Sequence, residues 1–369
     1  MLNKMEQIEQ KENSAGGRLL ALDAARGLAV VGMYIQHFAL NERNAFVSGN
    51  TMILFMLCSG ISYTLLMNGM ERRKAGARTV RTRVLARSVF LDLAGYLILM
   101  LNGPFAVVLP AYAMIFLLAL PFTRLKTPAL FRISGVLFVV CPPLMLIGMS
   151  LFSGVALLSD LAGGPLSALA WMPVFVMGMA VGRCKFSETG FLIKMIGAGT
   201  LLLLPFKIFS VAVLPGLALR LEQWMSVLPY YAQYEEAPYA PWPYNTSPIL
   251  WNMLLVDAPQ GGSLFELAIG SGGALILIGV LGLAEKRCKA VLKPFSMAGR
   301  CALSLYALQF LIAWVSAQLG VELSAFDLGA FAAGDLLVAA GALLLGRLLL
   351  HIAGGPLECC MKKFERLFL

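Results

Sequence analysis

The sequence predicts an all-α membrane protein, a polytopic bundle of about ten transmembrane helices with both chain termini in the cytoplasm. Hydrophobic residues make up 59% of the 369 residues and charged residues only 13%, which is more apolar surface than a soluble fold can bury. Apolar stretches of about 20 residues, the length that crosses a bilayer as a helix, recur along the chain. The residue alternation of a membrane β-barrel is absent, which leaves helices as the spanning structure.

Ten segments have the length and apolar character of membrane spans, the third of them short. In chain order they are Leu19–Leu40, Thr51–Met70, Ser88–Leu101, Phe105–Phe122, Ile133–Phe152, Pro165–Val181, Phe191–Val213, Leu264–Ala284, Ala298–Leu319 and Leu328–Ile352. They form one predicted domain, residues 18–353, between an N-terminal tail at residues 1–17 and a C-terminal tail at residues 354–369. Because the first tail mixes basic with acidic residues and lacks a cleavable signal pattern, we expect it to stay in the cytoplasm.

Basic residues gather in the connections on one side of the predicted bundle. The segment from Glu71 to Arg83 is strongly basic, as are the connections after spans four, six and eight, whereas the opposite connections carry only Arg43 and Arg220. Cytoplasmic loops are the ones enriched in Lys and Arg, so the asymmetry predicts an even number of spans. It also accounts for the net charge of +9 without a nucleic-acid partner, whose binding would need the cations on one face.

The sequence predicts neither a structural disulfide nor a metal site. All seven lie within predicted spans or on the predicted cytoplasmic side, so no external disulfide is expected. No residues have the spacing of metal ligands, and no metal is expected.

One outward connection, residues 215–263, is rich in tryptophan, tyrosine and proline. These side chains would line a site for an acceptor substrate, and Trp242 is the candidate residue to bind it. An aromatic belt lying against the membrane interface explains the same composition equally well, and both interpretations stay open.

The first predicted span contains an acid, a guanidinium and an imidazole, in Asp23, Arg26 and His37. Charged groups within a span are costly, so they mark either a function or an internal ion pair. Asp23 and Arg26 are three residues apart and can pair on one helix face. Eleven residues separate Arg26 from His37, about three helical turns or roughly 16 Å, so both side chains project from the same stripe.

This arrangement suits the transfer of an acyl group through the membrane. A thioester donor made in the cytoplasm has anionic phosphates at one end and a reactive carbonyl at the tip of a long arm. Arg26 and the basic segment would attract the phosphates, and His37 would act as the proton acceptor farther in. A bundle salt bridge at Asp23 and Arg26 with a merely interfacial His37 is the alternative.

Three stretches carry a family resemblance. Residues 22–29, Leu-Asp-Ala-Ala-Arg-Gly-Leu-Ala, followed by His37, resemble the first helix of the transmembrane acyltransferase superfamily, which includes bacterial acyltransferase family 3 and the heparan-α-glucosaminide N-acetyltransferase group. Residues 54–61, with Ser59-Gly60, are similar to the second helix of that family, and residues 299–309 to a late helix. Gln309 stands where many members of family 3 carry a second histidine.

The resemblance implies a membrane-embedded transferase that uses an acyl-CoA, in the first place acetyl-CoA, as donor substrate. Arg26 would contact the donor, Asp23 would orient Arg26, and His37 would be the base or a transient acyl carrier. The acceptor would be a hydroxyl or amine of a saccharide or glycan-like molecule reached from the outer side of a bacterial cytoplasmic (inner) membrane.

Several other residues complete the predicted site. The basic segment contributes four candidate ligands of the donor phosphates, Arg72, Arg73, Arg81 and Arg83. Tyr306 and Gln309 are three residues apart on one helix face and would hydrogen-bond the acceptor, although hydrogen bonding between helices explains them equally well.

A transporter is the main alternative function. In that case the charged residues of the spans would form a proton or ion relay. Transporters of the common kinds have paired inverted halves with broken helices at matching positions, a symmetry that this sequence lacks. A catalytically silent scaffold of the same fold is a third possibility, and the sequence leaves the oligomeric state open.

Overall fold

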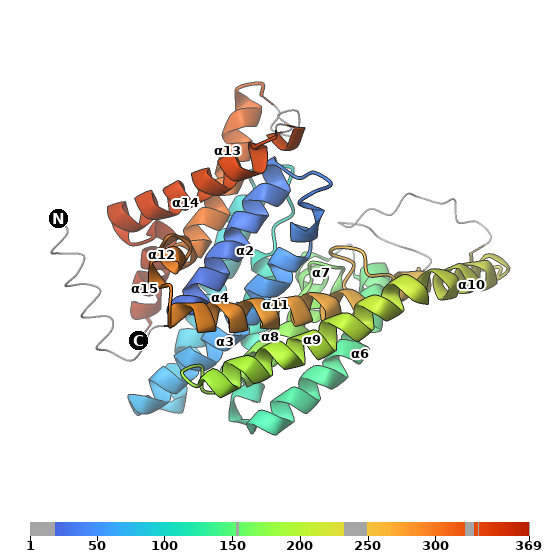
Figure 1. The fold of residues 1–369 in the computed structure, drawn as a ribbon, viewed down its shortest axis with the longest axis horizontal. Coiled ribbons are helices and arrows are strands. Elements are labelled where there is room, and N and C mark those ends of the chain that lie inside the picture. Colours follow the sequence, from blue (N-terminus) through green and yellow to red (C-terminus); the bar gives the residue numbers. More distant parts are fainter. Residues whose placement is uncertain (1–18, 153–154, 232–248, 322–327, 331, 369) are drawn as a thin grey trace.

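The computed structural model describes residues 19–152, 155–231, 249–321, 328–330 and 332–368. In these residues the chain forms α-helices and short 3-10 helices and no strand, so the predicted all-α class is confirmed for the described part. The helices pack into one bundle (Figure 1).

The first half of the chain contributes seven described α-helices and two 3-10 helices. They are α2 (Leu20–Phe38), η1 (Ala45–Val47), α3 (Asn50–Arg72), α4 (Ala77–Leu99), α5 (Leu109–Leu118), η2 (Pro121–Arg124), α6 (Thr127–Leu151), α7 (Ala156–Ala162) and α8 (Ala168–Val181).

The second half follows with α9 and α11 side by side and ends in a short terminal helix (Figure 1). Its elements are α9 (Thr189–Ala212), α10 (Leu214–Ser226), η3 (Trp251–Leu255), α11 (Leu264–Glu285), α12 (Lys289–Arg300), α13 (Ala302–Gln318), η4 (Leu328–Ala330), α14 (Gly334–Ala353) and α15 (Pro356–Arg366).

Several of these helices can cross a membrane. Among the described residues, five are long and apolar enough, namely α3 with the preceding η1, α6, α9, α11 and α14, and α12 with α13 makes a sixth if the bent pair is counted as one span. The helix α2 is 19 residues long, but Asp23, Arg26 and His37 lower its hydropathy. The apolar helices α5 and α8 have only 10 and 14 residues. The total of about ten spans therefore stays a prediction.

The basic segment after α3 differs from the expected loop. The helix α4 already begins at Ala77, so Arg81 and Arg83 lie on its first turns, and the short third span is the apolar part of a 23-residue helix. The hydropathy of the sequence marks only the apolar part of a helix. Arginine is a good helix former, so the helix can extend beyond that part through polar residues.

The predicted ninth span is broken. The helices α12 and α13 meet at Cys301 with a bend of 67°, and α12 starts at Lys289, within a stretch expected to be a connection. The residues expected to be a C-terminal tail instead form α15, which starts with Pro356 at its first position. Gly354 and Gly355, with φ of 63° and 85°, make the turn from α14, a conformation that favours glycine.

The helix α2 is the centre of the bundle and contacts α3, α11, α12, α13 and α14 (Figure 1). Small residues make this possible, since Ala24, Ala25 and Ala29 are fully buried. At the tightest point, a Cβ on Gly27 would collide with the carbonyl oxygen of Phe295, and a Cβ on Gly299 with that of Asp23. Glycine therefore lets the backbones of α2 and α12 touch beside Arg26.

We predict that Gly27→Ala lowers the thermal stability of the purified protein, because the added methyl group must push α12 away from α2. The matched control is Gly135→Ala on α6, where an added Cβ meets no atom within 4 Å and alanine improves helix propensity. Thermal unfolding in detergent should show a lower midpoint for Gly27→Ala than for Gly135→Ala. Equal midpoints would contradict the proposed close contact.

Candidate functional site

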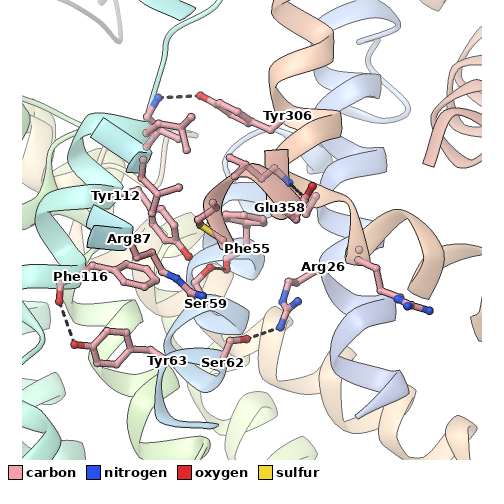
Figure 2. Close-up of a pocket in the computed structure, with 18 of the residues that line it drawn as sticks. Arg26, Phe55, Ser59, Ser62, Tyr63, Arg87, Tyr112, Phe116, Tyr306 and Glu358 are labelled. Carbon is pink, nitrogen blue, oxygen red and sulfur yellow. Dashed lines mark hydrogen bonds between the residues drawn. The ribbon is translucent and has the colours of Figure 1, made fainter. Parts of the chain in front are cut away.

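A cavity of about 220 Å³ lies between α2, α3, α4, α5, α12, α13 and α15. Its wall is mostly apolar and aromatic, with four charged side chains set into it. The lining residues are Arg26, Met33, Phe55, Ser59, Ser62, Tyr63, Arg87, Leu91, Val108, Leu109, Tyr112, Phe116, Gly299, Arg300, Ala302, Leu303, Tyr306, Glu358 and Met361, most of them drawn in Figure 2.

Arg26 is held in the cavity wall by its own helix and by α3. Its Nη1 lies 3.1 Å from Oδ1 of Asp23, three residues earlier, and its Nη2 donates to Oγ of Ser62 at 2.6 Å (Figure 2). The predicted pair of Asp23 and Arg26 is thus confirmed. The Asp23 side chain is 6% exposed and that of Arg26 is 22% exposed, so the carboxylate is buried behind the guanidinium that reaches the cavity.

Arg87 of α4 reaches the cavity from the opposite side, close to Ser59 (Figure 2). Its guanidinium is bound by a carboxylate of α15, because Arg87 Nε lies 2.7 Å from Oε1 of Glu365. The other carboxylate oxygen of Glu365 accepts from Nε of Arg83 at 2.9 Å. Of the four arginines predicted to bind donor phosphates, Arg83 is therefore already paired with a buried acid.

The other three predicted phosphate ligands lie elsewhere. Arg72 and Arg73 are exposed at the end of α3, and Arg81 is exposed on the first turns of α4. None of them lines the cavity.

Glu358 of α15 caps the helix that carries Tyr306. Its Oε1 accepts from the backbone N–H of Leu303 at 2.8 Å and of Ser304 at 3.2 Å, and the hydroxyl of Ser304 donates to Oε2. The first N–H groups of a helix have no partner within the helix and attract negative charge. The start of α13, directly after the 67° bend, is therefore stabilised by a residue more than fifty positions away.

Tyr306 and Gln309 share one face of α13, as predicted, but they have different partners. The hydroxyl of Tyr306 lines the cavity and accepts from the backbone N–H of Val108 at 3.0 Å. Gln309 is fully buried, and its Oε1 lies 3.1 Å from Nδ1 of His37. The predicted acceptor ligand Gln309 is thus a direct partner of the predicted base.

His37 does not line the cavity. Its ring stacks on Phe105, with centroids 4.0 Å apart, and meets Phe310 edge-on. Phe310 in turn packs on Tyr306, with centroids 5.0 Å apart. Aromatic rings therefore connect His37 with the cavity wall and separate it from the cavity itself.

Some residues of the cavity were not anticipated from the sequence. Arg87, Arg300 and Glu358 are three of its four charged lining residues, and Glu365, which does not line it, neutralises Arg87. Both glutamates lie in the segment expected to be a tail. The spacing of seven residues between Glu358 and Glu365 places both acids on one face of a helix and is the signal that could have indicated their common role.

Trp242, the candidate residue of the aromatic outward connection, lies outside the described residues.

Outside the cavity, Lys207 of α9 pairs with Asp257, in the segment after η3, at 2.7 Å. Burial raises the pKa of Asp257, but hydrogen bonds from Lys207 and Ser210 outweigh it, so the net pKa lies below its ordinary value.

The chemistry of the cavity favours an anionic ligand with an apolar portion. Arginine binds phosphate through paired N–H groups, and the remaining wall is largely apolar, with several aromatic side chains. Among the described residues, no group of three potential metal ligands gathers anywhere.

Neither a family model nor a curated protein matches the chain.

We predict that Glu358→Gln destabilises the protein by about 1–2 kcal/mol, because the α13 N-terminus loses a half-buried charged cap. The control is Glu188→Gln, which removes a glutamate whose exposed ion pair with Lys185 contributes little. Chemical unfolding followed by tryptophan fluorescence measures both. A Glu358→Gln protein as stable as the control would show that the cap is energetically unimportant.

Proposed function

We propose that this protein is a membrane-embedded acyltransferase, which moves an acyl group from a cytoplasmic acyl-CoA to a hydroxyl or amine of a saccharide or glycan-like acceptor. One observation carries the proposal: α2 places Arg26 in an arginine-lined cavity and, about three turns farther along, places His37 against a buried amide. Acetyl-CoA is the first candidate donor, and the membrane would be a bacterial cytoplasmic one.

The donor would lie with its phosphates toward the arginines and its arm toward His37. A cavity of about 220 Å³ holds only part of an acyl-CoA, so the nucleotide would lie outside it, near the exposed arginines Arg72, Arg73 and Arg81. The acyl end must then pass the ring of Phe105, which belongs to the non-helical segment between α4 and α5. Such a segment moves at lower cost than a packed helix.

The contact with Gln309 suits a base. An amide oxygen only accepts hydrogen bonds, so His37 would carry its proton on Nδ1 and present the lone pair of Nε2. Nε2 would take the proton of the acceptor hydroxyl while its oxygen attacks the thioester carbonyl carbon. The carbon–sulfur bond breaks, and the departing thiolate takes the proton back from the imidazolium, leaving an ester and free CoA.

A transporter is the second candidate, and the broken α12–α13 helix beside a charged cavity favours it. Interrupted membrane helices are typical of transporters, which bind substrates at the break. In this chain the N–H groups at the start of α13 already bind Glu358, and for that reason we prefer the transferase.

The decisive experiment measures acyl transfer from radiolabelled acetyl-CoA in proteoliposomes. His37→Ala should lower the transfer rate about a hundred- to ten-thousand-fold with donor affinity little changed, because the imidazole acts at the carbonyl. Arg26→Ala should weaken donor binding as well. The control is His351→Ala, the exposed second histidine. A His37→Ala rate within a few-fold of wild type would rule out the mechanism, and proton-driven flux without acyl product would identify a transporter.

The proposed orientation has its own test. In a chain whose native cysteines are replaced, a membrane-impermeant thiol reagent added to intact cells should label a cysteine at Ser226 but not one at Ala77, since basic connections stay in the cytoplasm. Both positions are exposed, so accessibility alone does not separate them. Labelling at Ala77 would discard the orientation.

A further inference from the structure

The carboxylate of Glu365 is buried between two guanidinium groups at the edge of the cavity. The side chain is 1% exposed, whereas those of Arg83 and Arg87 are 27% and 20% exposed. Each oxygen of the carboxylate binds a different arginine, and these arginines are one helical turn apart on α4. Two guanidinium groups held around one carboxylate present paired N–H donors that can also bind another anion.

The charges around the cavity show that an anionic ligand would be repelled by carboxylates already bound there. Three guanidiniums, those of Arg26, Arg83 and Arg87, are bound by two carboxylates, those of Asp23 and Glu365. A third acid, Glu358, also lines the cavity. A multiply charged phosphate that enters this cluster gains fully from the arginines only if a carboxylate leaves, because like charges in one buried site repel.

Of the three acids, Glu365 is the one that can leave. Asp23 belongs to the central helix and sits three residues from its own partner. Glu358 is fixed by two backbone N–H groups and a hydroxyl at the start of α13. Within the described residues, the Glu365 carboxylate is bound by guanidinium groups alone.

The attachment of α15 allows this movement. The helix follows the two-glycine turn at Gly354 and Gly355 and is anchored near that turn by Glu358. Its far end is held by Glu365 and by the packing of Phe364 on Phe90, with ring centroids 5.7 Å apart. Loss of the Glu365 contacts therefore loosens the far end, which keeps the contact of Phe364 with Phe90, while the turn end stays in place.

We propose that Arg83 and Arg87 form a binding site for a diphosphate or polyphosphate anion, and that Glu365 occupies this site in the unliganded protein. The helix α15 is then an internal competitor, displaced when the anion binds. The inference rests on the proposed function in one respect, since the diphosphate of an acyl-CoA would be the natural ligand. Its test uses no acyl transfer.

The test is hydrogen–deuterium exchange of residues 356–366 in nanodiscs, with inorganic pyrophosphate or with sodium chloride at equal ionic strength. In the wild-type protein, pyrophosphate should speed exchange of this helix severalfold, because Glu365 gives up its arginines. Glu365→Gln should exchange fast in both salts, since a neutral amide cannot balance two guanidiniums. The control Glu188→Gln, an exposed glutamate in a separate ion pair, should behave as wild type.

Two results would overturn the proposal: wild-type exchange that pyrophosphate leaves unchanged or slows, or a Glu365→Gln helix as protected as the wild-type helix. The wild-type comparison needs no folded variant, so an unstable Glu365→Gln protein does not weaken it. A protein that transfers acyl groups but keeps α15 protected in pyrophosphate would contradict only the displacement. One that releases α15 but makes no acyl product would contradict only the transferase.

Discussion

Compensation of guanidinium charge inside an apolar bundle is the constraint on which the rest of this structure depends. An unpaired ion in such an environment is costly, and each arginine that reaches the cavity from α2 or α4 has a carboxylate within hydrogen-bonding distance. The acids come from quite different places, Asp23 from the same turn of α2 and Glu365 from the end of the chain. The bundle must therefore bring α15 back to α4, and the two-glycine turn after α14 makes this return possible.

The terminal helix links stability to the candidate site. Through Glu358 it caps α13 at the bend, and through Glu365 it neutralises Arg83 and Arg87. The same eleven residues thus support the helix that carries Tyr306 and occupy the cations that an anionic substrate would need. An element that closes a site and stabilises its wall is well suited to couple ligand binding to a change in structure.

The helix α2 divides the candidate site into two parts. At one end Arg26 faces the cavity, and at the other His37 lies behind Phe105 and Phe310, bound to Gln309. A reaction that uses both residues needs a substrate long enough to span about three helical turns, and a path through the aromatic rings. An extended thioester donor meets the first requirement, and the non-helical segment that carries Phe105 makes the second feasible.

The sequence by itself determined the all-α content, the apolar helices long enough to cross a membrane and the pairing of Asp23 with Arg26. Runs of about 20 apolar residues mark such helices, and helical geometry makes residues three apart neighbours. It placed helix ends poorly, at α4 and at the α12–α13 break, since a helix can continue through polar residues after the hydropathy has fallen. Only the tertiary structure decided that Glu365 binds Arg87 and that His37 meets Gln309. These partners are 278 and 272 residues apart, and their contact depends on how whole helices pack, which no local pattern encodes.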